Sequence, residues 1–301
     1  AYYFKKGEPA GSAVKRIASE QINKALASIR QEDAHEAVHD VRKRLKKVRA
    51  LLRLVRYDTG KEFYKKSNVY YRDLGRMLSP LRDARTQVET LGQLRRDYAS
   101  ETTEQWEIHV PSWIAEKEKI VIRQKLENEN VLEQVRNELE QSIKSIDNWP
   151  VSEKTDFGVI YPGLNRVYKR GYKGFAKAYD TAGDKNFHEF RKRVKYLWYH
   201  INLLKLSWGP VLKRWARETH QLADDLGDDH DLTVLKATLA ELPSIGSNPE
   251  HPVNRIIRSE SDKFRTSAGI LAGRIYHEKP KRFTKRMAKY WDMWQEERDT
   301  D

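Results

Sequence analysis

The chain has 301 residues, of which 39% are hydrophobic and 34% are charged, a balance compatible with a folded globular protein. It contains no cysteine, which excludes disulfides, thiolate catalysis and cysteine-held metal centres. Its formal net charge of +13 predicts attraction to polyanions, whether nucleic acid, anionic lipid or inorganic phosphate polymers.

Localisation and order also follow from composition. No apolar run reaches the length of about 18 residues that a membrane span requires, and the first residues lack the apolar block of a secretory signal. These features favour a cytoplasmic location. Eight tryptophans and fifteen tyrosines argue against disorder.

Almost every segment has the composition and the apolar spacing of a helix, so we predict an all-α fold. Glycines and prolines separate the segments, and residues 149–163 are the best candidate linker. The expected helices, in chain order, cover residues 12–30, 35–57, 62–78, 82–97, 112–147, 163–180, 186–206, 211–226, 230–241, 252–277 and 281–297.

The sequence repeats itself about 150 residues apart. "VHDVRKRLKKVRALLRLV" (38–55) returns as "FHEFRKRVKYLWYHINLL" (187–204) at an offset of 149, and residues 74–91 match 222–239 at an offset of 148. A weaker match at offset 150 aligns Arg16 with Arg166. A repeat of this length is too long for a solenoid unit. We therefore predict one domain over 1–301 with duplicated halves of about 10–148 and 160–301.

Each copy of the repeated helix predicts an apolar face beside a cationic one. At 100° per residue, one stripe is apolar in both copies, and His39, Arg42, Lys46, Arg49 and Arg53 fall within roughly 80° beside it. His188, Arg191 and Lys195 occupy the same place in the second copy. The predicted core positions are Val38, Val41, Leu45, Val48, Leu52 and Val55, then Phe187, Phe190, Val194, Leu197, Ile201 and Leu204.

The cationic stripe favours a binding surface over an ordinary solvated face. Between Arg42 and Arg56 there are eight basic residues and no acid, so the helix forgoes the stabilising opposite-charge pairs that solvated faces use. Such a row repels itself unless an anion relieves it. Each histidine is either a neutral polar residue near the helix start, because neighbouring cations lower its pKa, or a donor to phosphate.

These motifs resemble the CHAD family (conserved histidine α-helical domain). The resemblance rests on the doubled His-x-x-Arg-[Lys/Arg]-x-x-Lys helix, followed in the two halves by "LSPLRDA" and "LGDDHDL". It covers essentially the whole chain. It implies two similar four-helix halves around a basic channel that binds inorganic polyphosphate without a cofactor.

Carried over position by position, the resemblance implies an anion-binding face with additional cations that are basic in both halves. The face comprises His39, Arg42, Lys43, Lys46, Arg49 and Arg53, then His188, Arg191, Lys192 and Lys195; the additions are Lys65, Lys66, Lys213, Arg214, Arg16 and Arg166. The second copy departs from the first at Trp198 and Asn202, which stand where the first has Arg49 and Arg53. We therefore expect an asymmetric face.

The Asp-rich stretch 224–231 offers a rival interpretation. Its paired aspartates resemble the Mg²⁺–diphosphate motif of helical prenyl-transfer enzymes, but no second Asp-rich helix accompanies them. A helix junction explains the cluster better, with Asp228 or Asp229 as the N-cap of a helix that begins near 230. We expect no metal site here.

Nucleic-acid binding is the stronger rival. The charge fits, but the sequence has no helix-turn-helix, zinc-finger or RNA-recognition signature. The aromatics of 168–179 could stack bases, although packing in the core is their commoner role. The basic segment 279–291 is likewise expected to pack, with a membrane-surface or polyanion contact as the alternative.

We predict a polyphosphate-binding module for targeting, storage or regulation, associated with polyphosphate granules, and not an enzyme. Polyphosphate carries about one charge per phosphate, which calls for many Lys and Arg donors along a surface. The alternatives are a nucleic-acid-binding helical protein and a Mg-dependent diphosphate-handling enzyme.

Overall fold

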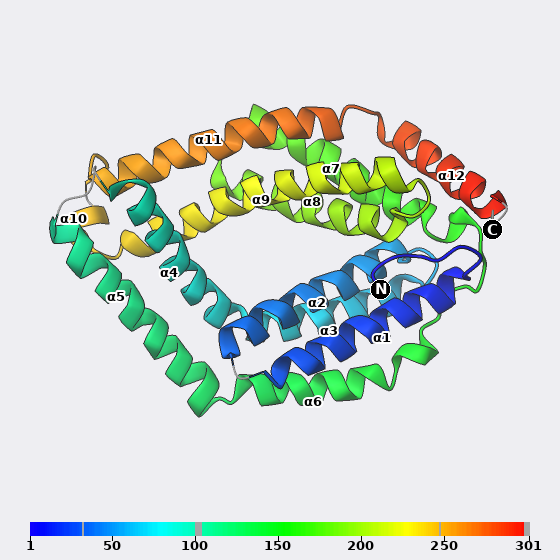
Figure 1. The fold of residues 1–301 in the computed structure, drawn as a ribbon, viewed down its shortest axis with the longest axis horizontal. Helices are drawn as coiled ribbons and strands as arrows, with labels where there is room; N and C mark the ends of the chain where they lie inside the picture. Colours follow the sequence, from blue (N-terminus) through cyan, green and yellow to red (C-terminus); the bar gives the residue numbers. More distant parts are fainter. Residues whose placement is uncertain (32, 100–103, 247, 298–301) are drawn as a thin grey trace.

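The computed structural model describes residues 1–31, 33–99, 104–246 and 248–297, with the side chains of 104–108 excepted. Over these ranges the chain is built of helices and contains no strand, as the sequence predicts (Figure 1). The α-helices are α1 (Ala10–Ile29), α2 (Ala34–Leu54), α3 (Lys61–Met77), α4 (Ser79–Asp97), α5 (Glu104–Ile122), α6 (Val131–Ile143), α7 (Tyr161–Asp180), α8 (Asp184–Leu204), α9 (Gly209–Leu239), α10 (Pro243–Gly246), α11 (Pro252–Ile275) and α12 (Pro280–Glu296).

The segment between Pro111 and Asn130 departs from the expected helix boundaries. The segment predicted as one helix over 112–147 divides into α5, a π-helical stretch Arg123–Asn128, and α6. Asn130 separates them with a φ of 49°, a left-handed conformation that asparagine tolerates better than most residues. Pro111, in contrast, lies inside α5.

The helix junction predicted near Gly227 is wrong. α9 runs without interruption from Gly209 to Leu239, so Asp228 and Asp229 lie inside a helix and cap nothing. A glycine inside a helix costs only about 1 kcal/mol. Burial of Leu222, Leu226 and Leu232 on one face of α9 exceeds that cost.

The two repeated helices lie at the centre of the molecule. α1 packs along α2 in the way that α7 packs along α8, and α2 also contacts α7 and α8 directly. Where α2 and α8 meet, Nε2 of the buried His200 donates to the carbonyl oxygen of Ala50 at 2.9 Å. α7 comes so close to the end of α2 that a Cβ on Gly163 would lie 1.8 Å from the Leu54 carbonyl oxygen. These contacts fix the two copies relative to each other.

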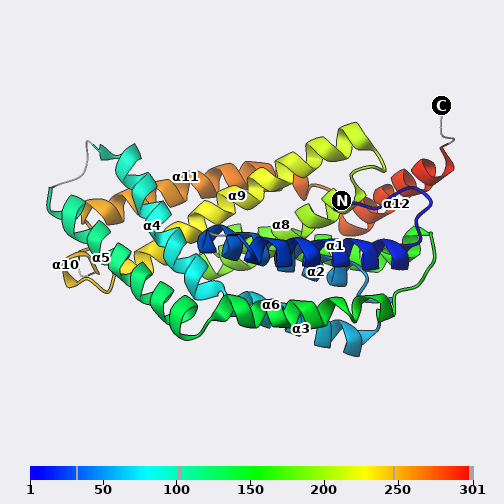
Figure 2. The ribbon, with the colours of Figure 1, turned by 60° about the horizontal axis from the view of Figure 1, so that its bottom comes forward.

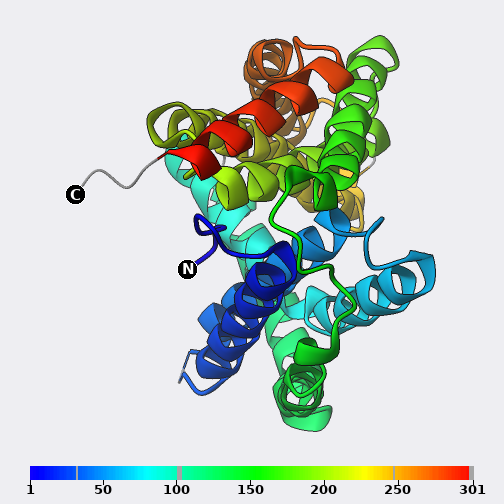
Figure 3. The same ribbon diagram turned by 90° about the vertical axis from the view of Figure 1, so that its right-hand side faces the viewer.

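The remaining helices complete two groups around this centre. α1, α2, α3 and α6 lie side by side (Figure 2). Seen from the end, the blue helices α1 and α2 occupy one side and the orange and red helices α11 and α12 the other (Figure 3). A second apolar cluster joins α4, α5, α9 and α11 at the end of the molecule that lies on the left in Figure 1. It includes Leu91, Ile114, Leu235 and Ile256. None of the described helices has the length and apolarity needed to cross a bilayer.

Candidate functional site

The apolar stripes of the repeated helices are confirmed. Every predicted core position on α2 and α8 is at most 4% exposed. Asp33 caps the start of α2 by accepting from the backbone N–H groups of His35 and Glu36. With the apolar stripe turned inward, the neighbouring cationic stripe is held at the margin of the core.

Cations from three helices meet beside the crossing of α2 and α8. Each of these cations lowers the pKa of at least one of the others or has its own pKa lowered by them. We call this set the central cluster: Arg42 and Lys46 from α2, Arg191 and Lys195 from α8, and Arg82 from α4.

The two equivalent arginines of the central cluster are held differently. The Arg42 guanidinium donates to the Gly75 carbonyl oxygen at 2.6 Å and to the Ser79 hydroxyl. Nε of Arg191 is buried without a hydrogen-bond partner. The residue that aligns with Ser79 is Gly227, which has no side chain. It lies next to Arg191, since a Cβ at this position would be 3.5 Å from Nη2 of Arg191. The serine therefore anchors Arg42, and the glycine leaves Arg191 without that anchor.

The lysines of the central cluster carry the electrostatic strain. Enclosure by the protein and repulsion from Arg42, Arg191 and Lys195 lower the pKa of Lys46 to about 7. Lys46 is nevertheless exposed to solvent, so an anion can reach it from outside. Burial and Arg191 also lower the pKa of Lys195, although Asp224 lies 3.8 Å away. The cations approach more closely than their own charges favour.

Both repeated histidines adjoin the central cluster and are neutral at pH 7. Enclosure and repulsion from Arg82 and Lys43 lower the pKa of His39, and enclosure and Lys192 do the same for His188. Nδ1 of His188 lies 3.1 Å from Nδ1 of His230 on α9, and the pKa of His230 is lowered to about 3. A neutral imidazole can still donate one N–H to an anion.

The side of the site formed by α9 is acidic, which the sequence reasoning did not predict. Asp224, Asp228 and Asp231 follow one another at helical spacing near Lys195. Crowding by protein and by the other aspartates raises the pKa of Asp228 to about 6. The site thus combines a cationic side with a weaker anionic one.

The neighbouring aspartates have structural roles. Asp225 accepts from the Ser267 hydroxyl at 2.6 Å, and the buried Asp229 accepts from Nε of Arg265 at 2.7 Å. These bonds join α9 to α11. Over the part of the chain that the structure describes, no group of three or more His, Cys, Asp or Glu side chains could hold a metal ion.

Two predicted cations on α2 lie beyond the central cluster. Arg49 and Arg53 share the Asn68 side-chain oxygen as acceptor. Arg53 lines a pocket together with Arg166.

The other predicted cations are distributed over the surface. Lys43, Lys192 and Arg214 each pair with an acid of their own helix, and Arg16 pairs with Glu8 and Glu20. Lys65, Lys66 and Lys213 are exposed on α3 and α9.

Sequence reasoning missed Arg82 and His230. The alignment at offset 148 pairs these two residues, and in the structure each adjoins the histidine of its own half. The aligned motifs "LSPLRDA" and "LGDDHDL" contain them both, so the repeat itself carried the information.

The C-terminal segment packs as expected, and the aromatic segment 168–179 does so only in part, because Tyr172 and Tyr179 are 38% and 37% exposed. Tyr168 is fully buried and stacks on Phe283 with ring centroids 3.9 Å apart. Phe283, Met287 and Trp291 of α12 are also buried.

Residues 16–240 match the protein-family model described as CHAD domain. A search of curated proteins found no match to the chain.

Proposed function

Because the chain belongs to the CHAD domain family, we propose that it binds inorganic polyphosphate along the central cluster and the cations that continue from it. The observation that carries the proposal is the meeting of cations from three helices around Lys46, whose pKa is lowered first by enclosure and then by repulsion from Arg42, Arg191, Lys195 and Arg82. A flexible chain with one charge per phosphate relieves this repulsion at several positions at once.

The proposed binding surface extends from the central cluster over both copies of the repeat, within a single domain of two halves. It comprises His39, Arg42, Lys43, Lys46, Arg49, Arg53, His188, Arg191, Lys192 and Lys195, with Lys65, Lys66, Lys213, Arg214, Arg16 and Arg166 as additional contacts and Arg82 as a new one. The histidines donate one N–H each to phosphate oxygens. CHAD domains are generally non-catalytic binding modules. We place this module in the cytoplasm at polyphosphate granules.

Packing of the aromatic rings supports polyphosphate over nucleic acid. Trp198 aligns with Arg49, and its ring already packs on His220 and Tyr199, with centroids 4.1 and 4.7 Å away. A ligand without bases needs no stacking partner.

Competition binding tests the proposal. Long-chain polyphosphate should displace a labelled polyphosphate at concentrations where single- and double-stranded DNA of equal charge do not, at near-physiological salt. Equal competition by DNA would reduce the activity to general polyanion binding. Detection of Mg²⁺-dependent diphosphate hydrolysis would contradict the non-catalytic assignment.

Paired charge reversals locate the surface. Arg42→Glu with Lys46→Glu should weaken polyphosphate binding far more than Lys119→Glu with Lys125→Glu, which makes the same change in net charge on α5 and the adjoining π-helical stretch. Equal losses would mean that a diffuse field holds the ligand.

A further inference from the structure

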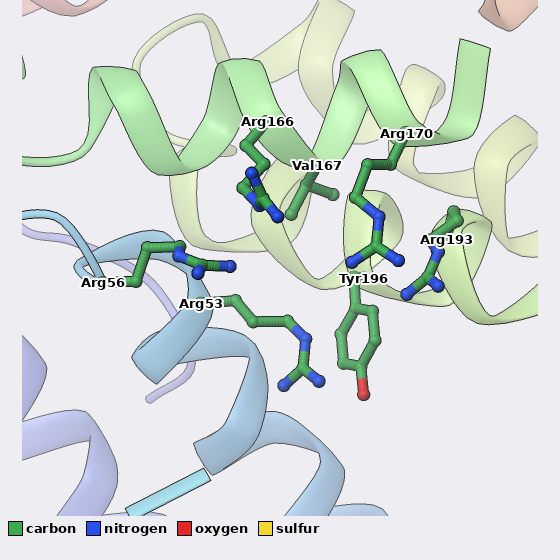
Figure 4. A pocket seen from close by; sticks show the side chains of 7 residues that line it. All are labelled: Arg53, Arg56, Arg166, Val167, Arg170, Arg193 and Tyr196. Atoms are coloured by element: carbon green, nitrogen blue, oxygen red, sulfur yellow. The ribbon is translucent and has the colours of Figure 1, made fainter. Parts of the chain in front are cut away.

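A cationic pocket lies outside the central cluster. Figure 4 shows five guanidinium groups that turn toward one space from three elements of the fold. The lining residues are Arg53 and Arg56 at the end of α2, Arg166 and Arg170 on α7, and Arg193 with Tyr196 on α8. We call this the arginine pocket. Along α2, the contact between Ala50 and His200 lies between Lys46 and Arg53, which separates the pocket from the central cluster.

Neutral groups position most of these arginines. Arg53 donates to the Asn68 side-chain oxygen and lies 4.0 Å from the centroid of the Tyr196 ring. Arg56 lies over the Tyr64 ring at 4.3 Å. Neutral acceptors and aromatic faces orient a guanidinium without cancelling its charge. These cations are therefore held in place with their charge available.

Carboxylates compensate little of the charge in the pocket. Among the described hydrogen bonds of the five arginines, Arg193 is the one that reaches a carboxylate, bonding Glu189 at 2.9 Å, and Lys192 shares that carboxylate. Partial desolvation and repulsion from Arg193, Arg166 and Arg53 lower the pKa of Arg170. The end of α2 favours Arg53 and Arg56 through the helix dipole, but this leaves the cations of α7 and α8 unexplained.

The other copy of the repeat provides an internal comparison. Arg16 aligns with Arg166. Nε and Nη2 of Arg16 donate hydrogen bonds to the Glu8 carboxylate at 2.6 and 2.7 Å. Its Nη1 also bonds Glu20 at 3.1 Å. At offset 150 the residue that aligns with Glu20 is Arg170. In the first copy the Glu20 carboxylate thus neutralises Arg16, whereas in the second copy the aligned residue, Arg170, adds another positive charge.

One ion pair within the repeated helix is the same in both copies. Arg44 bonds Asp40 at 3.1 Å, as the aligned Arg193 bonds Glu189. The copies differ in the bound carboxylate and also at two lining positions, where Arg53 and Tyr196 align with Asn202 and Lys47. The first copy is neutralised internally, and the second is open to an anion from outside.

We propose that the arginine pocket binds a compact phosphoryl dianion, either the end group of a polyphosphate chain or a free phosphate. Guanidinium forks match the oxygens of a phosphate in pairs, and several forks around one space suit a dianion better than the single charge of an internal phosphate. The space between the guanidinium groups is small, about 20 Å³, and it opens to solvent, so the ligand must be compact and sit at the mouth of the pocket. The end-group alternative rests on the proposed function, and the free-phosphate alternative does not.

The substitution Arg170→Glu tests the proposal by giving the second copy the residue of the first. Arg170 is exposed, so the fold should persist, and circular dichroism checks this. Lys185→Glu, at an exposed position of α8 outside the pocket, makes the same change in net charge. We expect Arg170→Glu to weaken binding of inorganic phosphate or of linear tripolyphosphate at least about tenfold, and Lys185→Glu less than about threefold.

Three probes distinguish the sources of the phosphoryl group. Inorganic phosphate reports free-phosphate binding, and linear tripolyphosphate against cyclic trimetaphosphate reports end-group binding, because the ring has no ends. A loss for the linear chain with none for the ring supports the end group. The proposal would be overturned if Arg170→Glu and Lys185→Glu had equal effects on every probe. It would also be overturned if Arg170→Glu weakened binding of the ring and of the linear chain equally but did not weaken binding of phosphate.

The central cluster serves as an independent control. Arg42→Glu with Lys46→Glu should reduce binding of long-chain polyphosphate and leave phosphate binding by the arginine pocket within about threefold of the unmodified protein. Failure of the proposed function would appear as weak long-chain binding by the unmodified protein. Failure of the pocket proposal would appear only in the Arg170→Glu comparison.

Discussion

Polyphosphate binding should strengthen as the pH falls from 8 to 6. In the free protein the pKa of Lys46 is about 7, because enclosure and the cations Arg42, Arg191, Lys195 and Arg82 oppose its charged form. A bound polyanion favours that charged form, so binding takes up a proton. At pH 8 about one tenth of Lys46 is charged, and at pH 6 about nine tenths, which predicts up to roughly tenfold higher affinity at pH 6.

The size of this effect has an upper limit and a second contributor. Solvent access to Lys46 screens part of the repulsion, so tenfold is the most that this residue supplies. Protonation of Asp228, whose pKa is about 6, removes a negative charge near the ligand and acts in the same direction below pH 7. The effect of Lys46 is therefore isolated between pH 7 and 8.

A titration of affinity against pH with the variant Lys46→Arg tests the reasoning. Arginine stays charged over this range, so the variant should bind almost equally at pH 7 and 8 while the unmodified protein loses affinity. Calorimetry in buffers of different ionisation heat should also detect proton uptake in the unmodified protein and less in the variant. An unchanged slope in Lys46→Arg would refute the role of Lys46.

Other predictions concern packing and salt. Gly163→Ala should destabilise the fold by about 2 kcal/mol or more in urea unfolding, because its Cβ would overlap the Leu54 carbonyl oxygen, whereas Gly273→Ala in open space inside α11 should stabilise it by about 0.5–1 kcal/mol. Gly227→Ala should also be neutral or stabilising, since its Cβ meets Arg191 only at ordinary contact distance; a loss above about 1 kcal/mol would show that the contact is tighter. Finally, the logarithm of polyphosphate affinity should fall linearly with the logarithm of salt concentration, and a flat line would exclude a ligand held mainly by charge.

Much of the architecture could be predicted because it depends on local periodicity. The apolar stripes through Val41 and Leu45 and through Phe190 and Val194 were identified from spacing alone, and all four side chains are buried. A buried helix face repeats its apolar residues at 3.6-residue intervals whatever it packs against. The break at Gly227 was predicted wrongly. Glycine disfavours a helix interior by only about 1 kcal/mol, and the tertiary packing of α9, which the sequence does not display, outweighs this preference.

The composition of the site was harder to predict because it depends on which helices meet. Asp228 and Asp231 read as features of a helix start, yet the uninterrupted α9 brings them beside Arg191. Arg82 has no feature of its own in the sequence that marks it as part of a site, yet α4 carries it to Lys46. Neither meeting follows from periodicity, since both require the packing of helices that are distant in sequence.

A count of charges also does not reveal which cations are available to a ligand. Arg16 and Arg166 align in the repeat and would be equivalent by sequence, but Arg16 is neutralised by two carboxylates while Arg166 donates to the hydroxyl of Tyr57 at 3.4 Å. The same distinction separates Arg42, held by a carbonyl and a hydroxyl, from surface cations paired with acids of their own helix. A cation oriented by neutral groups keeps its full charge for an anion, and a cation in an ion pair must first give up its partner. The net charge of +13 therefore indicates the class of ligand, whereas the neutral partners of individual arginines determine where on the molecule that ligand binds.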